Sequence, residues 1–162
     1  MKKRVVSLGL AAMMAMSMTA CGGSGNASTS ESAAEDAQGA EGADGEVFKI
    51  GGIGPTTGGA AVYGLAVQHG AEVAVKEINE AGGINGYQVA FNFQDDENDP
   101  EKAINAYNTL KDWGMQVLMG TVTTTPCVAV ADKTAQDNMF EVTPSASSTD
   151  VIAGDNVFQV CF

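Results

Sequence analysis

Residues 48–83 decide the fold, and they read FKIGGIG PTTGGA AVYGLAVQHGAEVAVKEINE AGG. Residues 48–54 form a short strand-like run, and a glycine-rich loop leads from them into a helical pattern over residues 64–81. One face of that helix is expected to carry Val67, Ala71, Ala74, Val75 and Ile78. Gly82 and Gly83 end it, because glycine tolerates the left-handed conformation of a helix cap. A strand, a loop and a helix in this order are typical of an α/β unit.

The alternation of strand and helix continues to the end of the chain. Further strands are expected at 87–94, 115–119, 139–142 and 157–161. A second helix starts at Pro100 with Asp99 as its N-cap, and a third runs from Pro126 to about Gln136. The buried face of the second helix is expected to carry Ala103, Ala106, Tyr107, Leu110 and Trp113. Since strands that alternate with helices pair in parallel, the sequence predicts a doubly wound parallel sheet.

The first 46 residues differ in composition from the rest. Lys2, Lys3 and Arg4 precede an uncharged apolar stretch, and small residues then lead to Cys21. This order indicates an export signal over residues 1–21. The approach to Cys21 resembles the lipobox of bacterial lipoproteins, in which the cysteine is lipidated and the chain is cleaved before it. A buried helix with an incidental cysteine is the alternative.

Residues 22–46 are expected to form a disordered acidic tether. They consist mainly of Gly, Ser, Ala and acidic residues, with no basic and no aromatic residue. Such a composition buries too little apolar surface to offset chain entropy, and like charges favour extension. Residues 47–162 are then the folded domain. Because the chain stops directly after its last expected strand, we expect this domain to be part of a longer protein.

The charge and the cysteines exclude two classes of protein. Eight Lys and Arg residues stand against 20 Asp and Glu residues, which gives a formal net charge of −12, and no arginine follows Arg4. Nucleic-acid binding needs clustered basic side chains, so we expect no nucleic-acid partner. Three cysteines are too few for a disulfide scaffold. Cys127 and Cys161 are expected to be buried thiols, with a disulfide between them as the alternative.

No catalytic or cofactor motif is complete in the domain. The loop at 51–59 has Thr57 where the dinucleotide fingerprint needs its third glycine, and it lacks the lysine of a phosphate-binding P-loop. The acidic stretch 95–100 lacks the glycine of a calcium-binding EF-hand loop. His69, the single histidine, is expected on the polar side of the first helix. We therefore expect no enzymatic activity, no cofactor and no metal.

Two hydroxyl-rich turns follow the third and fourth expected strands. They are 121–126 (TVTTTP) and 143–148 (TPSASS). Ligands of open α/β sheets bind at the carboxyl ends of the strands, and the first turn also leads into a helix N-terminus, which favours an anion. The turns therefore predict a site for a carboxylate or a similar small polar group. The alternative is that these residues are only caps and turn formers.

These turns belong to a larger set of motifs. The others are Ile50-Gly51, residues 54–58 (GPTTG), Tyr63-Gly64, residues 70–72 (GAE), residues 78–87 (INEAGGINGY), Asp95-Asp96, Asp99-Pro100 and Gly120. In combination they resemble the Leu/Ile/Val-type substrate-binding proteins of ABC importers, which have the type I periplasmic-binding-protein fold. The resemblance covers about residues 47–162 and implies the N-terminal lobe of a two-lobed protein, without its second lobe.

The resemblance also implies a function. It implies an extracytoplasmic lipoprotein, anchored to the cell membrane, that captures a small amino acid or related amide and delivers it to the permease subunits of an ABC importer. A ligand-sensing module of a signalling receptor is the alternative. Since the family's acidic partner for the ligand ammonium lies in the second lobe, the ligand stays open among branched-chain amino acids, other amino acids, amides and urea.

Four residues match ligand contacts of the family. Tyr63 matches an aromatic residue that packs against the ligand, and Thr124 falls where the family commonly has a serine that binds the ligand carboxylate. Ser145 matches a position that offers a backbone contact to the ammonium. Ser147 matches a threonine whose hydroxyl contacts the ligand.

Overall fold

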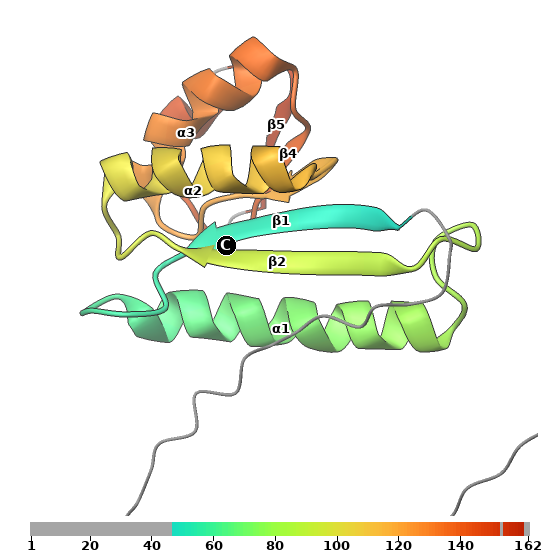
Figure 1. The fold of residues 1–162 in the computed structure, drawn as a ribbon. Helices are drawn as coiled ribbons and strands as arrows, with labels where there is room; N and C mark the ends of the chain where they lie inside the picture. Colours follow the sequence, from blue (N-terminus) through green and yellow to red (C-terminus); the bar gives the residue numbers. More distant parts are fainter. Residues whose placement is uncertain (1–46, 153, 161–162) are drawn as a thin grey trace, which may run out of the picture. The chain divides into compact units, whose positions relative to one another are not determined.

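The computed structural model describes residues 47–152 and 154–160 (Figure 1). The predicted signal over 1–21 with lipidation of Cys21, the predicted tether over 22–46 and any pairing of Cys161 lie outside these residues. Cys127 is buried as a free thiol. In the part of the chain that is described, no helix is long and apolar enough to cross a membrane.

Five strands form one parallel sheet, which confirms the predicted α/β layer. The strands are β1 (Phe48–Gly54), β2 (Val89–Asp95), β3 (Val117–Met119), β4 (Glu141–Thr143) and β5 (Val157–Gln159). Their order in the sheet is β2-β1-β3-β4-β5, and every neighbouring pair is parallel. Because the chain adds β2 on one side of β1 and the later strands on the other, the order reverses between β1 and β3. The carboxyl ends of β1 and β3 therefore flank a topological switch point, where ligands of such sheets bind.

Helices cover both faces of this sheet, as a doubly wound fold requires. They are α1 (Ala61–Glu80), α2 (Pro100–Trp113) and α3 (Thr124–Asp137), with a short 3-10 turn, η1 (Thr149–Val151). Figure 1 shows α1 on one face of β1 and β2 and shows α2 and α3 on the opposite face. The α2 helix starts as predicted, because the Asp99 side chain accepts hydrogen bonds from the amides of Glu101 and Lys102, each 2.9 Å long.

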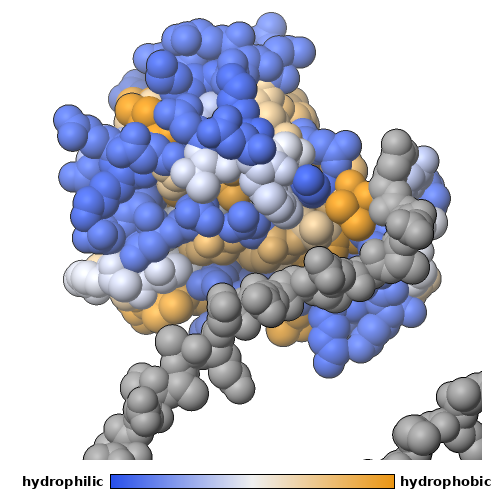
Figure 2. All heavy atoms as spheres, viewed as in Figure 1, coloured by the Kyte–Doolittle hydropathy of each residue, from blue (hydrophilic) through white to orange (hydrophobic). Residues whose placement is uncertain are grey.

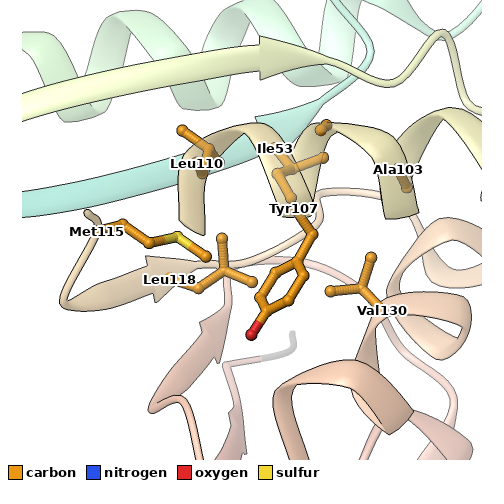
Figure 3. Close-up of a cluster of buried hydrophobic side chains, with 8 residues drawn as sticks. Ile53, Ala103, Tyr107, Leu110, Met115, Leu118 and Val130 are labelled. Atoms are coloured by element: carbon orange, nitrogen blue, oxygen red, sulfur yellow. The ribbon is translucent and has the colours of Figure 1, made fainter. Parts of the chain in front are cut away.

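The core lies between the sheet and the α2–α3 layer. Its buried members are Ile53, Ala103, Ala106, Tyr107, Leu110, Met115, Leu118 and Val130. Figure 3 shows the ring of Tyr107 between Leu118 and Val130. The Tyr107 hydroxyl donates a 2.9 Å hydrogen bond to Asp137, so that the polar end of this buried side chain is satisfied.

The apolar face of α1 is less buried than predicted. Ala74, expected on the buried face, is exposed, and Val62 and Val73 are 68% and 58% exposed. Figure 2 shows hydrophobic side chains along the lower edge of the view, where α1 lies. The α1 helix packs against β1 and β2, and on the same face of the sheet the exposed rings of Phe140 and Phe158 lie 5.2 Å apart.

Several element boundaries differ from the prediction. The α1 helix begins at Ala61 rather than at residue 64, and α3 begins at Thr124 rather than at Pro126. Proline is tolerated throughout the first turn of a helix, because the amide it lacks has no helical acceptor there. The β2 strand begins at Val89 rather than at residue 87, since Tyr87 pairs with Ile84 in a separate bridge.

Candidate ligand-binding site

The two hydroxyl-rich turns lie side by side at the carboxyl ends of β3 and β4. Three hydrogen bonds join them: Thr143 Oγ1 donates to Thr121 O (2.9 Å), Ser145 Oγ donates to Val122 O (2.6 Å), and the Ser147 amide donates to Thr124 Oγ1 (3.1 Å). A side-chain hydroxyl is the donor in the first two bonds and the acceptor in the third. The structure thus brings together three of the four predicted ligand contacts, Thr124, Ser145 and Ser147.

Thr124 is poised to donate a hydrogen bond. Its hydroxyl oxygen accepts the Ser147 amide, so its own hydrogen is left for another acceptor. Thr124 and Thr125 are also the first two residues of α3, and their amides have no carbonyl of an earlier helical turn to bond. One hydroxyl and two amides at the positive end of a helix suit a carboxylate.

Ser145 and Ser147 offer different groups. The Ser145 hydroxyl hydrogen is committed to the Val122 carbonyl, so this hydroxyl can meet a ligand only as an acceptor. Ser147 is exposed, and its amide is committed to Thr124. An ammonium needs acceptors and a carboxylate needs donors, and these turns present both kinds of group.

Tyr63 lies in the first turn of α1, after the loop that leaves β1. Its side chain is 64% exposed, and among the described residues no hydrogen bond joins it to the two turns. The structure therefore places Tyr63 in the first turn of α1, which follows the strand next to β3, and in the described residues no hydrogen bond links its side chain to Thr124, Ser145 or Ser147. An exposed aromatic ring at this edge offers apolar area to a ligand.

A buried carboxyl group lies beneath the turns. Glu141 of β4 accepts a 2.8 Å hydrogen bond from Thr134 and a 3.6 Å one from the Cys127 thiol. Burial raises the pKa of Glu141, and burial together with the Glu141 charge raises the pKa of the Cys127 thiol to about 12. Glu141 was not among the predicted site residues; an acidic residue within an expected strand is the signal that could have found it.

A second carboxylate holds the glycine-rich loop after β1. Asp95 accepts hydrogen bonds from the Thr56 amide (2.9 Å), the Thr57 hydroxyl (2.6 Å) and the Glu97 amide (2.9 Å). Burial alone would raise the pKa of Asp95, but these hydrogen bonds outweigh it and lower the pKa. Asp95 thus fixes the loop that leads to Tyr63. Within the described residues no three His, Cys, Asp or Glu side chains are grouped to hold a metal ion.

Comparison with known proteins identifies the family. Residues 47–162 match the family model described as periplasmic binding protein. The chain belongs to the periplasmic binding protein family. Its relatives include Leu/Ile/Val-binding protein homolog 3 of Brucella melitensis, 40% identical over 69% of this chain and 31% of the relative. The Leu/Ile/Val-binding protein BraC3 of Rhizobium johnstonii is 37% identical over the same shares. The chain thus spans about 31% of the length of these curated relatives.

Solved structures of periplasmic binding proteins share the fold. The branched-chain amino acid transporter substrate-binding protein LivJ of Streptococcus pneumoniae, solved with isoleucine, has a TM-score of 0.66 at 29% identity. The match covers 70% of this chain and 33% of LivJ. The leucine-binding protein LivK of Thermotoga maritima has a TM-score of 0.64 at 26% identity, over 72% of this chain and 33% of LivK. These findings confirm the predicted family and the type I fold.

In this periplasmic binding protein, Asp96 is a buried acid with an unmet hydrogen bond. Its Oδ1 accepts the Asn98 amide at 2.8 Å, whereas Oδ2 has no partner in the described part of the chain. Burial, with smaller contributions from Asp95 and Asp99, raises the pKa of Asp96 to about 6. Between about pH 4 and about pH 6, the folded protein therefore keeps a proton on Asp96 that the unfolded chain has lost. Stability contributed by this group falls as the pH rises from about 4 to about 6.

Asp96→Asn is expected to remove this pH dependence. The amide oxygen can still accept from Asn98, and no buried charge forms at neutral pH. We expect the variant to be about 1–2 kcal/mol more stable than the parent at pH 7.5, less than the full linkage value because the surrounding loop is solvated, and about equal at pH 4. Urea unfolding at both pH values measures this, with the exposed Asp132→Asn as the control. A variant less stable than the parent at pH 7.5 would contradict the prediction.

Proposed function

We propose that this protein is an extracytoplasmic solute-binding lipoprotein that captures a small amino acid or related amide. The observation that carries the proposal is the Thr124 hydroxyl, oriented by the Ser147 amide beside the unbonded first amides of α3. This group of donors lies at the switch point of the sheet, where a ligand carboxylate would meet both the hydroxyl and the helix dipole.

The rest of the ligand would meet acceptors and an apolar surface. The ammonium would lie against oxygen atoms of the 143–148 turn at Ser145, and the Ser147 hydroxyl would bond the ligand's polar end. The exposed ring of Tyr63 would cover the ligand's side chain. The names of the relatives favour a branched-chain amino acid, because LivJ was solved with isoleucine and the Brucella and Rhizobium relatives are named for Leu, Ile and Val.

The proposal includes the protein's place in the cell. A lipid on Cys21 would hold the domain outside the cytoplasm by the tether, and the permease subunits of an ABC importer would receive the ligand. The names of the relatives support this role, since LivJ is described as a substrate-binding protein of a branched-chain amino acid transporter. Since the chain spans about a third of its relatives' length, binding is best tested in the complete protein.

Thr124→Val is expected to weaken ligand binding in the complete protein while leaving the fold intact. Valine keeps the shape of threonine but removes the hydroxyl, which costs roughly 1.5–3 kcal/mol when the lost partner is charged. This corresponds to about a tenfold or larger increase in Kd. Calorimetry with L-leucine and L-isoleucine, followed by other amino acids and small amides, measures it.

Two further variants serve as controls for this measurement. Thr124→Ser keeps the hydroxyl and is expected to bind close to the parent's affinity. Thr125→Val removes the neighbouring exposed hydroxyl, which is not held by the opposite turn, and is expected to change the affinity little. Equal affinity of Thr124→Val and the parent would remove Thr124 from the site. A parent protein that binds no ligand of the panel would overturn the proposed ligand class.

A further inference from the structure

We infer that Gln159 is a positioning residue for the ligand site, an inference that rests on the proposed function. Gln159 is the last residue of β5, and its half-buried side chain reaches the 143–148 turn. Its Nε2 atom lies 2.5 Å from the Ala146 carbonyl oxygen and 3.2 Å from the Ser148 carbonyl oxygen. One side-chain amide thus bonds the turn on both sides of Ser147.

The position of Gln159 in the sheet explains why it reaches this turn. In the register of β4 and β5, Gln159 lies beside Thr143, so both side chains are on the same face. Thr143 Oγ1 accepts the Ala146 amide at 3.2 Å and donates to Thr121. Ala146 is therefore bonded at both of its backbone groups, its amide to Thr143 and its carbonyl to Gln159. The side chain of Ala146 is buried against Cys127 and Val151, which leaves this residue little freedom.

Gln159 would affect the ligand indirectly, through the Ser147 amide. That amide donates to the Thr124 hydroxyl, and that bond decides which lone pair of the hydroxyl is used and where its hydrogen points. Since Gln159 bonds the carbonyls on both sides of Ser147, it fixes the direction of the Ser147 amide. Without Gln159 the turn keeps its chain path but orients Thr124 less well.

The chemistry at this position requires two donors. Two carbonyl oxygens face the Gln159 amide, so a carboxylate of the same shape would face them without a hydrogen to share. Gln159→Glu and Gln159→Met both remove the donors, the first with the shape retained and the second with an apolar chain of similar length. If Gln159 orients the Ser147 amide, both variants should weaken ligand binding.

The matched control is Asn156, the residue directly before β5. Its side-chain amide donates a 2.8 Å hydrogen bond to the Met139 carbonyl oxygen, at the amino end of β4 and away from the two turns. Asn156→Leu therefore removes one side-chain amide bond to a backbone carbonyl, from the residue before β5 to a residue before β4, without touching the two turns. A purely structural Gln159 would behave like Asn156.

The test measures affinity, melting temperature and amide hydrogen exchange in the complete protein. In the Gln159 variants we expect about a tenfold increase in the Kd for L-isoleucine and faster exchange of the Ser147 amide without ligand. We expect Asn156→Leu to lower the melting temperature by a similar amount with the Kd and the Ser147 exchange unchanged. Equal effects of the Gln159 and Asn156 variants on Kd would overturn the inference.

The hydrogen-exchange measurement separates this inference from the proposed function. If the parent binds neither L-isoleucine nor the other members of the panel, the proposed ligand class fails, and the exchange rate of Ser147 still decides whether Gln159 orients the turn. Unchanged exchange in Gln159→Met and Gln159→Glu would overturn the positioning role whether or not a ligand is known.

Discussion

Gly64→Ala is expected to lower the free energy of unfolding by about 3 kcal/mol or more, because a well-packed site cannot admit another methyl group without moving backbone. Gly64 is the buried residue of α1. A Cβ atom there would overlap the Pro55 carbonyl oxygen and lie 2.8 Å from the Pro55 nitrogen. Since the clash is with backbone, no side-chain rotation relieves it, and the start of α1 must shift together with Tyr63.

Gly70→Ala is the matched control for this variant, because it lies in the same helix. A Cβ at Gly70 would meet nothing within 4 Å, and the position is exposed. We expect this change to stabilise the protein by roughly 0.5–1 kcal/mol through the higher helix propensity of alanine. Urea unfolding of both variants measures the two effects, which should have opposite signs. If Gly64→Ala is as stable as Gly70→Ala, the close packing of α1 on Pro55 is wrong.

Gly120→Ala is expected to cost about 3 kcal/mol, because it adds strain at a buried carboxyl and also breaks a hydrogen bond to it. A Cβ at Gly120 would overlap Glu141 Oε1 and lie 2.7 Å from Glu141 Cγ. Glu141, which is fully buried, would have to leave Thr134 and Cys127 to make room. Thermal and urea unfolding measure the loss.

A double-mutant cycle tests the cause of this loss. Glu141→Ala alone should destabilise the protein, since it leaves a cavity and removes the partner of Thr134. Gly120→Ala combined with Glu141→Ala should cost about 1–2 kcal/mol less than the sum of the single changes, because the truncated side chain makes room for the new methyl group. Additive effects would show that Glu141 does not occupy the space above Gly120.

The sequence predicts the α2 layer well because its information is local. Helical spacing predicts a buried face of five residues, and the structure buries four of them fully and Trp113 partly; the four are Ala103, Ala106, Tyr107 and Leu110. Asp99 caps this helix through its own side chain. The buried face of α1 was predicted less well, since Ala74 is exposed. Periodicity shows which side of a helix is apolar, but not how much of the sheet lies beneath it.

In the candidate site, too, the features encoded locally could be predicted, and those that depend on distant segments could not. The two turns could be predicted, because hydroxyl residues after successive parallel strands must meet at one edge of the sheet. Gln159 could not be assigned, because its role depends on carbonyl groups of Ala146 and Ser148 on another segment. Glu141 was missed for a similar reason, since Gly120 and Thr134 make room for it and satisfy it only in the folded chain.

The hydrogen bond between Ser147 and Thr124 has a consequence for the thermodynamics and kinetics of recognition. Both partners of this bond belong to the protein, so the rotational entropy of the Thr124 side chain is lost on folding and would not be lost again on binding at the proposed site. In the proposed site, such a preformed anchor would serve every ligand with a carboxylate equally well. Differences in affinity among amino acids should therefore come from contacts to their side chains, and should be expressed as differences in residence time rather than in association rate.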